Sequence, residues 1–123
     1  MNAFFALVLA FAAGMPPLTI NYDTNVTALK LYDDYRKDKT KADKLYEGKR
    51  LFLHGIVKVE SANMSVVYLV IPGHGDDDVT AVIDDHALTL VPIYKPGDKF
   101  DLVCTGFGIV FNLPLVRNCK PLN

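Results

Sequence analysis

The stretch YEGKRLFLHGIVKV, residues 46–59, alternates with the period of two that is typical of a β-strand. One face carries Leu51, Leu53, Val57 and Val59, and the other carries Phe52, His54, Ile56 and Lys58. Gly55 falls within the first set, and a glycine inside an alternating strand marks a bend, a bulge or a close backbone approach. A small closed barrel needs such a bend, because its first strand pairs in both halves of the sheet. The stretch therefore predicts a barrel, with an ordinary edge strand as the alternative.

Composition indicates a single folded domain. The chain has 123 residues, of which 50% are hydrophobic, and a formal net charge of −1. It is large enough to bury a core, and this composition indicates neither a disordered chain nor a strongly basic binding protein.

Residues 1–17 differ from the rest of the chain. The run from Ala3 to Ala13 has no polar side chain, and Gly-Met-Pro-Pro follows it. Such a run is short for a membrane span but suits the hydrophobic region of a secretory signal, although no Lys or Arg precedes it. We expect either a cleaved signal peptide or a retained apolar arm that packs against a partner or a membrane. The first interpretation places the protein in the periplasm or outside the cell.

The two cysteines, Cys104 and Cys119, fall on neighbouring predicted strands. In an exported chain this predicts one disulfide, which would close a loop of about 15 residues and stabilise the fold by about 3 kcal/mol. Two free thiols in the core are the alternative.

The segment before the first strand predicts helix. Thr27 is a suitable N-cap, and apolar residues recur behind it at helical spacing as far as Tyr35. The charged run 36–41 interrupts this spacing, which resumes over residues 42–46. We therefore expect two short helices or one bent helix.

Four more strands are predicted, over residues 65–71, 79–83, 99–105 and 115–122. A short helix capped by Asp84 or Asp85 precedes Pro92, and residues 106–114 link the last two strands. Five strands with a helix between the third and fourth are the layout of the OB-fold, a Greek-key barrel. The predicted organisation is a mainly β domain with some helix. It comprises an apolar segment (1–17), a linker with the N-terminal helical segment (18–45) and a barrel (46–123).

A spaced set of residues over the helical segment and first strand resembles the tRNA-anticodon-like OB-fold family. The set is Ala28, Leu31, Tyr35, Asp38, Ala42, Asp43, Tyr46, Gly48, Lys49, Leu51, Leu53, Gly55 and Val57, followed later by Gly97-Asp98-Lys99, Leu115 and Cys119. The resemblance covers about residues 27–122. Its members are small bacterial proteins, mostly exported or lipid-anchored, and many are uncharacterised or proposed to bind nucleic acids. Members often carry a lipid-attachment cysteine after the apolar run, and this chain has none there.

The charges of the barrel disfavour general nucleic-acid binding. From Tyr46 onward, seven basic residues face nine acidic ones, a formal −2, and the loop 72–78 carries three consecutive aspartates. Phosphate contacts dominate the affinity of proteins for nucleic acids, so an acidic barrel is poorly suited to nucleic-acid binding.

Two sets of residues are candidate sites. The possible partner or ligand face comprises Lys49, Arg50, Phe52, His54, Ile56 and Tyr68, and the apolar members could instead form a second core layer beneath the helical segment. Weak metal candidates are His74, Asp76, Asp77 and Asp78, for which a solvated acidic loop is the simpler interpretation. The sequence contains no catalytic motif and no phosphate-binding fingerprint, so we predict no enzyme activity and no cofactor.

The sequence therefore predicts a non-catalytic, exported OB-fold domain that works through contact with a protein partner or with copies of itself. A subunit of a larger assembly is a specific form of this prediction. A single-stranded nucleic-acid-binding module is the alternative, and a small-ligand or cation-binding domain is the third interpretation. Membrane contact is expected only through residues 1–17, if they are retained.

Overall fold

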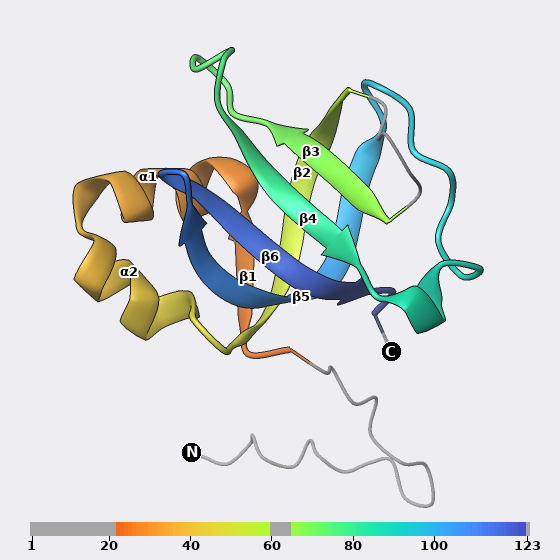
Figure 1. Cartoon of the computed structure of the whole chain (residues 1–123), viewed down its shortest axis with the longest axis horizontal. Coiled ribbons are helices and arrows are strands. Elements are labelled where there is room, and N and C mark those ends of the chain that lie inside the picture. Colours follow the sequence, from red (N-terminus) through yellow and green to blue (C-terminus); the bar gives the residue numbers. More distant parts are fainter. Residues whose placement is uncertain (1–21, 60–64, 123) are drawn as a thin grey trace, which may run out of the picture.

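The computed structural model describes residues 22–59 and 65–122. The apolar segment 1–17, for which we expect a signal peptide or a retained arm, lies outside these residues. The elements are β1 (Thr24–Thr27), α1 (Ala28–Lys37), α2 (Lys39–Tyr46), β2 (Arg50–Val59), β3 (Val66–Val70), β4 (Asp78–Ile83), the 3₁₀ turn η2 (Asp85–Ala87), β5 (Lys99–Val110) and β6 (Leu113–Lys120). The two helices lie together at one end of the barrel, and η2 lies at the opposite end (Figure 1).

Five strands close into the predicted barrel. The hydrogen-bonded order is β1-β2-β3-β4-β6-β5, and an additional pairing of β2 with β5 closes the ring. β4 and β6 run parallel, whereas the other pairs within the ring are antiparallel. This is the five-stranded Greek-key arrangement of the OB-fold, so the predicted fold class is confirmed.

The first barrel strand, β2, pairs in both halves of the sheet, as the sequence predicts. Residues 50–56 pair with β5, and the pairing with β3 begins at Val57, opposite Leu69. Gly55 lies at this change of partner, where a Cβ atom would stand 3.1 Å from Leu69 Cδ1 and 3.3 Å from Ala28 Cβ. The glycine therefore allows both β3 and the start of α1 to approach the strand closely.

Two capping residues set the helix boundaries. The Thr27 side chain accepts a hydrogen bond from the Lys30 backbone N–H at 3.1 Å and begins α1. Asp38 has an extended backbone (φ −161°), which ends α1, and its carboxylate accepts from the Lys41 N–H at 3.1 Å to begin α2. The helical segment is therefore two short helices.

Three elements differ from the sequence prediction. Residues 24–27 form a short strand, β1, parallel to the first half of β2, where we predicted a linker and a cap. The helix predicted between the third and fourth barrel strands is only the three-residue turn η2. The segment 106–114, predicted to be a link, belongs instead to a continuous β5–β6 hairpin whose loop is Phe111-Asn112.

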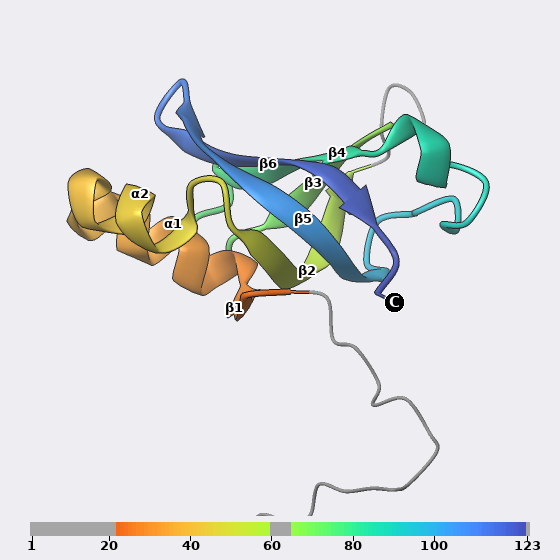
Figure 2. The same ribbon diagram turned by 90° about the horizontal axis from the view of Figure 1, so that it is seen from below.

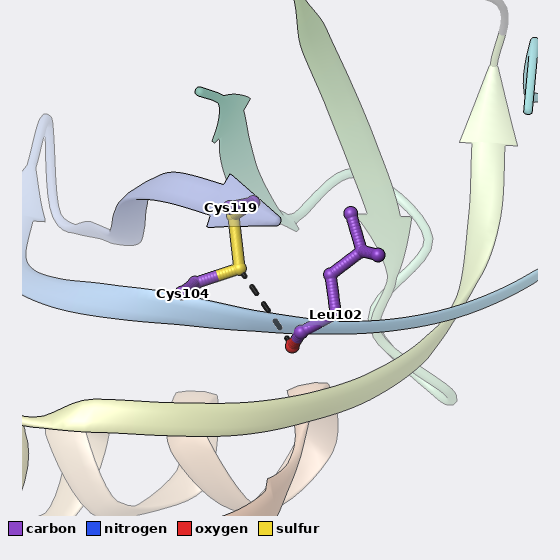
Figure 3. Close-up of a disulfide and its surroundings, with 3 residues drawn as sticks. All are labelled: Leu102, Cys104 and Cys119. Carbon is purple, nitrogen blue, oxygen red and sulfur yellow. Dashed lines mark hydrogen bonds between the residues drawn. A yellow bond between two sulfur atoms is a disulfide. The ribbon is translucent and has the colours of Figure 1, made fainter. Parts of the chain in front are cut away.

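Cys104 and Cys119 form the predicted disulfide between β5 and β6 (Figure 3). Their sulfur atoms are 2.06 Å apart, and the two residues are 1% and 0% exposed. The Cys104 sulfur also lies 3.9 Å from the Leu102 carbonyl oxygen, a packing contact because a disulfide sulfur carries no proton. The bond therefore lies in the barrel wall and forms part of the core.

Candidate functional site

The predicted partner face is divided between two parts of the barrel. Phe52, His54 and Ile56 point outward from the half of β2 that pairs with β5. Tyr68 lies on β3 opposite Val59, seven residues farther along β2 than Phe52. These residues therefore do not form one surface.

The outer face of β2 is partly occupied by β1 and the residues before it. The Tyr22 ring lies 5.3 Å from the Phe52 ring, whose centroid is 4.5 Å from that of His54. The two ring nitrogens of His54 contact carboxylate and amide oxygens, Asp101 Oδ1 at 2.6 Å and Asn25 Oδ1 at 2.5 Å. A core layer beneath the helices is wrong for this face, since Phe52 and His54 are only half-buried and Ile56 is 42% exposed.

Arg50 of the basic pair Lys49-Arg50 is not a free cation. The Arg50 guanidinium lies 3.3 Å from the Asp23 carboxylate, which also accepts the Arg50 backbone N–H at 2.9 Å. These hydrogen bonds, the backbone one first, lower the pKa of Asp23. The positive charge of Arg50 is thus compensated next to β1.

A shallow, mostly apolar cleft of about 480 Å³ opens beside the start of α1. It is lined by residues 27–29, 54–56, Val70, Pro72, Lys99 and Asp101. One cationic and one anionic side chain border it, so it has no strong preference for charge. Its shape allows contact with a small apolar group but not enclosure of a ligand.

Three of the four metal candidates of the loop 72–78 contact the rest of the fold. The buried Tyr32 hydroxyl donates to the Asp77 carboxylate, and the Tyr32 ring lies tilted against the His74 ring, with the centroids 5.1 Å apart. The hydrogen bond to Asp77, and then burial, raises the pKa of Tyr32. Asp78 pairs with Lys58 at 3.5 Å, and Asp76 is exposed. Within residues 22–59 and 65–122, no three His, Cys, Asp or Glu side chains are grouped to hold a metal ion.

An open sheet face lies over β3, β4 and the adjoining part of β6, on the side toward the viewer in Figure 1. The buried residues of β3 and β4 alternate with half-buried outward ones. Cross-strand pairs on this face are Val66–Val82, Tyr68–Thr80 and Val70–Asp78, and Leu115 of β6 lies beside Thr80. Asp78 is the single charged residue among those of β3 and β4, and Lys58 neutralises it. This is the surface on which OB-folds bind oligonucleotides and oligosaccharides.

Of this open face, the sequence identified Tyr68 as a partner-face residue and Asp78 only as a weak metal candidate. The valines of both strands are typical core residues, so their pattern could not distinguish the outer face from the inner one. Side chains alternate between the two faces from Val66 to Val70. Once one of these residues is known to face the core, the alternation assigns the others to the inner or the outer face.

The β5–β6 hairpin adds exposed aromatic residues that the sequence analysis did not single out. Phe111 at its tip is 94% exposed, and Phe107 is 40% exposed. The Arg117 guanidinium lies over the Phe107 ring, 4.8 Å from its centroid. A second hollow, of about 460 Å³, lies between this hairpin and α2. Lys39 and Asp43, which line this hollow, form an ion pair at 2.6 Å, so the charges of these two side chains compensate each other.

Two tyrosines join the helices to each other reciprocally. The Tyr35 hydroxyl of α1 donates to Asp43 of α2 at 2.9 Å, and the Tyr46 hydroxyl of α2 donates to Asp34 of α1 at 2.5 Å. Burial, and then the bond to a carboxylate, raises the pKa of both tyrosines. Burial alone would raise the pKa of Asp34, but the hydrogen bonds from Tyr46 and Lys30 outweigh it and lower this pKa.

This helix pair is attached to the barrel at Gly106. The Gly48 N–H donates to the Gly106 carbonyl at 2.8 Å, and the Gly106 N–H donates to the Lys49 carbonyl at 3.0 Å. A Cβ atom on Gly106 would stand 2.1 Å from the Tyr46 carbonyl oxygen, so no other residue fits without a backbone shift. Most residues that carry the family resemblance lie in this junction of α1, α2 and β2, not on the open face.

The described residues contain no helix long and apolar enough to cross a membrane.

No curated protein matches the chain. A similar solved structure is that of a proposed nucleic acid-binding lipoprotein from Klebsiella pneumoniae subsp. pneumoniae MGH 78578, with a TM-score of 0.56 and 15% sequence identity. The similarity covers 83% of this chain and 92% of that one, and at this identity it establishes the fold alone. The sequence model of the tRNA_anti-like family matches residues 13–120. The chain therefore belongs to the tRNA_anti-like family of OB-fold proteins.

Proposed function

We propose that this chain is a non-catalytic, exported binding domain whose open β3–β4–β6 face contacts a protein partner. The observation that carries the proposal is the chemistry of that face. Valine, leucine, tyrosine and threonine cover it, and its one carboxylate, Asp78, is paired with Lys58 at 3.5 Å. Apolar and aromatic surface with few charges is typical of the centre of a protein–protein interface.

The same face is poorly suited to single-stranded nucleic acid. An OB-fold that binds a strand combines stacking aromatics with a groove of cations that follows the phosphates. Here Tyr68 supplies an aromatic ring, but Lys58 is engaged by Asp78, and the Arg117 guanidinium lies over Phe107. Few cations therefore remain to contact phosphates.

Two observations support export. The disulfide is of the kind that persists in oxidising compartments, and the similar solved structure is described as a lipoprotein. Both agree with the secretory signal expected over residues 1–17.

A charge placed on the open face tests this proposal. The full chain, extracted gently from its own cells, is expected to elute with its partner in size-exclusion chromatography. Thr80→Lys puts a cation at the centre of the face and should return the chain to its own size, whereas Thr89→Lys, at an exposed site outside the face, should not. A wild-type chain that elutes alone, or a Thr80→Lys chain that elutes with its partner, would contradict the proposal.

Nucleic-acid binding is the second candidate, favoured by the description of the similar structure. Its test is the affinity of the chain for an oligothymidylate at low salt, with Lys49→Glu/Arg50→Glu as the variant. We expect weak binding that the charge reversal leaves unchanged. Tight binding that the reversal abolishes would support the nucleic-acid function instead.

A further inference from the structure

We infer that the tip of the β5–β6 hairpin is a contact element, and that the Phe111 ring inserts into an apolar pocket of the protein partner. The inference rests on the proposed function and names the residue that recognises the partner. Three observations carry it: the backbone of the turn, the exposure of the ring and the chemistry around it.

The turn places Phe111 in a backbone conformation that phenylalanine rarely adopts. Val110 pairs with Leu113, so the loop has two residues, and both have positive φ, 53° at Phe111 and 67° at Asn112. Two-residue hairpin loops of this kind prefer Asn, Asp or Gly at both positions, because a bulky Cβ is strained there. Asn112 follows this preference, and Phe111 does not.

The Phe111 ring gains almost no burial on folding that could offset this strain. Phe111 is 94% exposed, more than any other large apolar residue in the described part of the chain. Its neighbours Ile109 and Leu113 pack against the core, so the hairpin is already anchored without it. A strained and exposed aromatic residue is typical of a position kept for function.

The chemistry around the ring selects the kind of partner. No charged residue occurs between Gly106 and Val116, and the nearest cation along β6, Arg117, lies 4.8 Å from the centroid of the Phe107 ring. Phosphates of a nucleic acid, or anionic headgroups of a membrane, would require cations beside the ring. Lys39, in the hollow between this hairpin and α2, is paired with Asp43 at 2.6 Å. An apolar pocket on a protein requires no cation beside the ring.

The tip also stands where a partner on the open face would meet it. In Figure 2 the hairpin tip rises past the sheet on the side of β4 and β6, away from β1 and β2. A protein bound over β3, β4 and β6 would therefore meet the Phe111 ring at the edge of the same contact.

Site-specific photocrosslinking of the full chain in its own cells tests the inference. A photoreactive benzoyl-phenylalanine replaces Phe111, Val82 on the open face or, as control, Ile93, which is 71% exposed on the β4–β5 connection. We expect the same protein adduct from positions 111 and 82 and none from position 93. With the probe at Val82, Phe111→Asn should reduce the adduct about tenfold, because burial of a phenylalanine ring contributes at least that factor in affinity. Ile93→Asn should leave it unchanged.

The outcomes separate this inference from the function on which it rests. An adduct from position 82 that Phe111→Asn does not reduce, or no adduct from position 111, would overturn the inference and leave the proposed function standing. Position 111 reacting only with lipid, with nucleic acid or with a second copy of the chain would also overturn it. Absence of any protein adduct from both positions would overturn both.

The same variant has a second readout. Phe111→Asn should raise the Tm by about 4 °C, because asparagine tolerates positive φ. A lower Tm would show that the ring serves folding, and the inference would fail.

Discussion

The junction of α1, α2 and β2 and the open face of β3, β4 and β6 are built in opposite ways. In the junction, two tyrosine–carboxylate pairs and the backbone bonds of Gly106 leave little freedom for any side chain. On the open face, half-buried residues meet neighbours of the sheet on one side and solvent on the other. The first region holds the helices to the barrel, and the second is the surface on which we propose that a partner binds.

This difference explains what family membership does and does not convey. The residues that carry the resemblance, such as Tyr35, Asp43 and Tyr46, are those with the tightest structural roles. None of the outward residues of β3 and β4 belongs to that set. A chain can therefore belong to this family and bind a ligand different from that of its relatives.

The largest expected effect is that of Gly106→Ala. The new Cβ would stand 2.1 Å from the Tyr46 carbonyl oxygen, so either the strand or the helix end must move and break the bonds that join them. We expect a loss of at least about 3 kcal/mol in the free energy of unfolding, measured by urea denaturation. Gly75→Ala is the matched control, since nothing lies within 4 Å of its Cβ position. Equal stability of the two variants would mean that the junction is not tightly constrained.

A smaller effect is expected from pH through the two tyrosines of the junction. Their pKa values are raised in the folded chain, so their contribution to stability is complete below the unfolded value of about 10 and is lost as pH rises above it. Each tyrosine should lower the free energy of unfolding by about 1.4 kcal/mol per pH unit in that range. In the Tyr46→Phe variant, the free energy of unfolding should fall less steeply with pH, because one of the two tyrosines no longer contributes. Urea denaturation from pH 9 to about pH 11 measures this slope. Identical slopes for the variant and the wild type would show that Tyr46 does not hold its proton in the folded chain.

The smallest effect is expected on the open face. Tyr68→Thr removes one cross-strand contact with Thr80 and leaves the core unchanged, so its cost should be about 1 kcal/mol or less in the same denaturation experiment. The same substitution should weaken the partner complex. A cost above about 2 kcal/mol would make Tyr68 a structural residue and would remove the contrast between the two regions.

The parts of the fold that the sequence predicts correctly are those with a strong local pattern. The alternation around Gly55, the N-cap at Thr27 and the two cysteines each predict a definite local feature, and the structure agrees with all three. The order of these elements was enough to identify the OB-fold.

The elements that were missed depend on tertiary contacts. β1 has four residues, and only its pairing with β2 makes it a strand. Residues 106–114 are predicted to be a link, but Gly106 is required by its contact with Tyr46 and lies inside β5. The candidate face was divided for the same reason, since the alternation along one strand cannot predict which outward residues of different strands become neighbours.

The buried disulfide has a consequence for locating the protein, because the redox state of its cysteines is set in the compartment where the chain folds. Both cysteines lie in the barrel wall, 1% and 0% exposed, so reductants and oxidants reach them poorly once the barrel has closed. Exchange between thiol and disulfide needs access to a sulfur atom, and the state set during folding should therefore persist through cell lysis. Alkylation of the denatured chain, after rapid acid quenching of the cells, would read out that state. The redox state of the two cysteines would therefore show whether the chain folds in an oxidising or a reducing compartment.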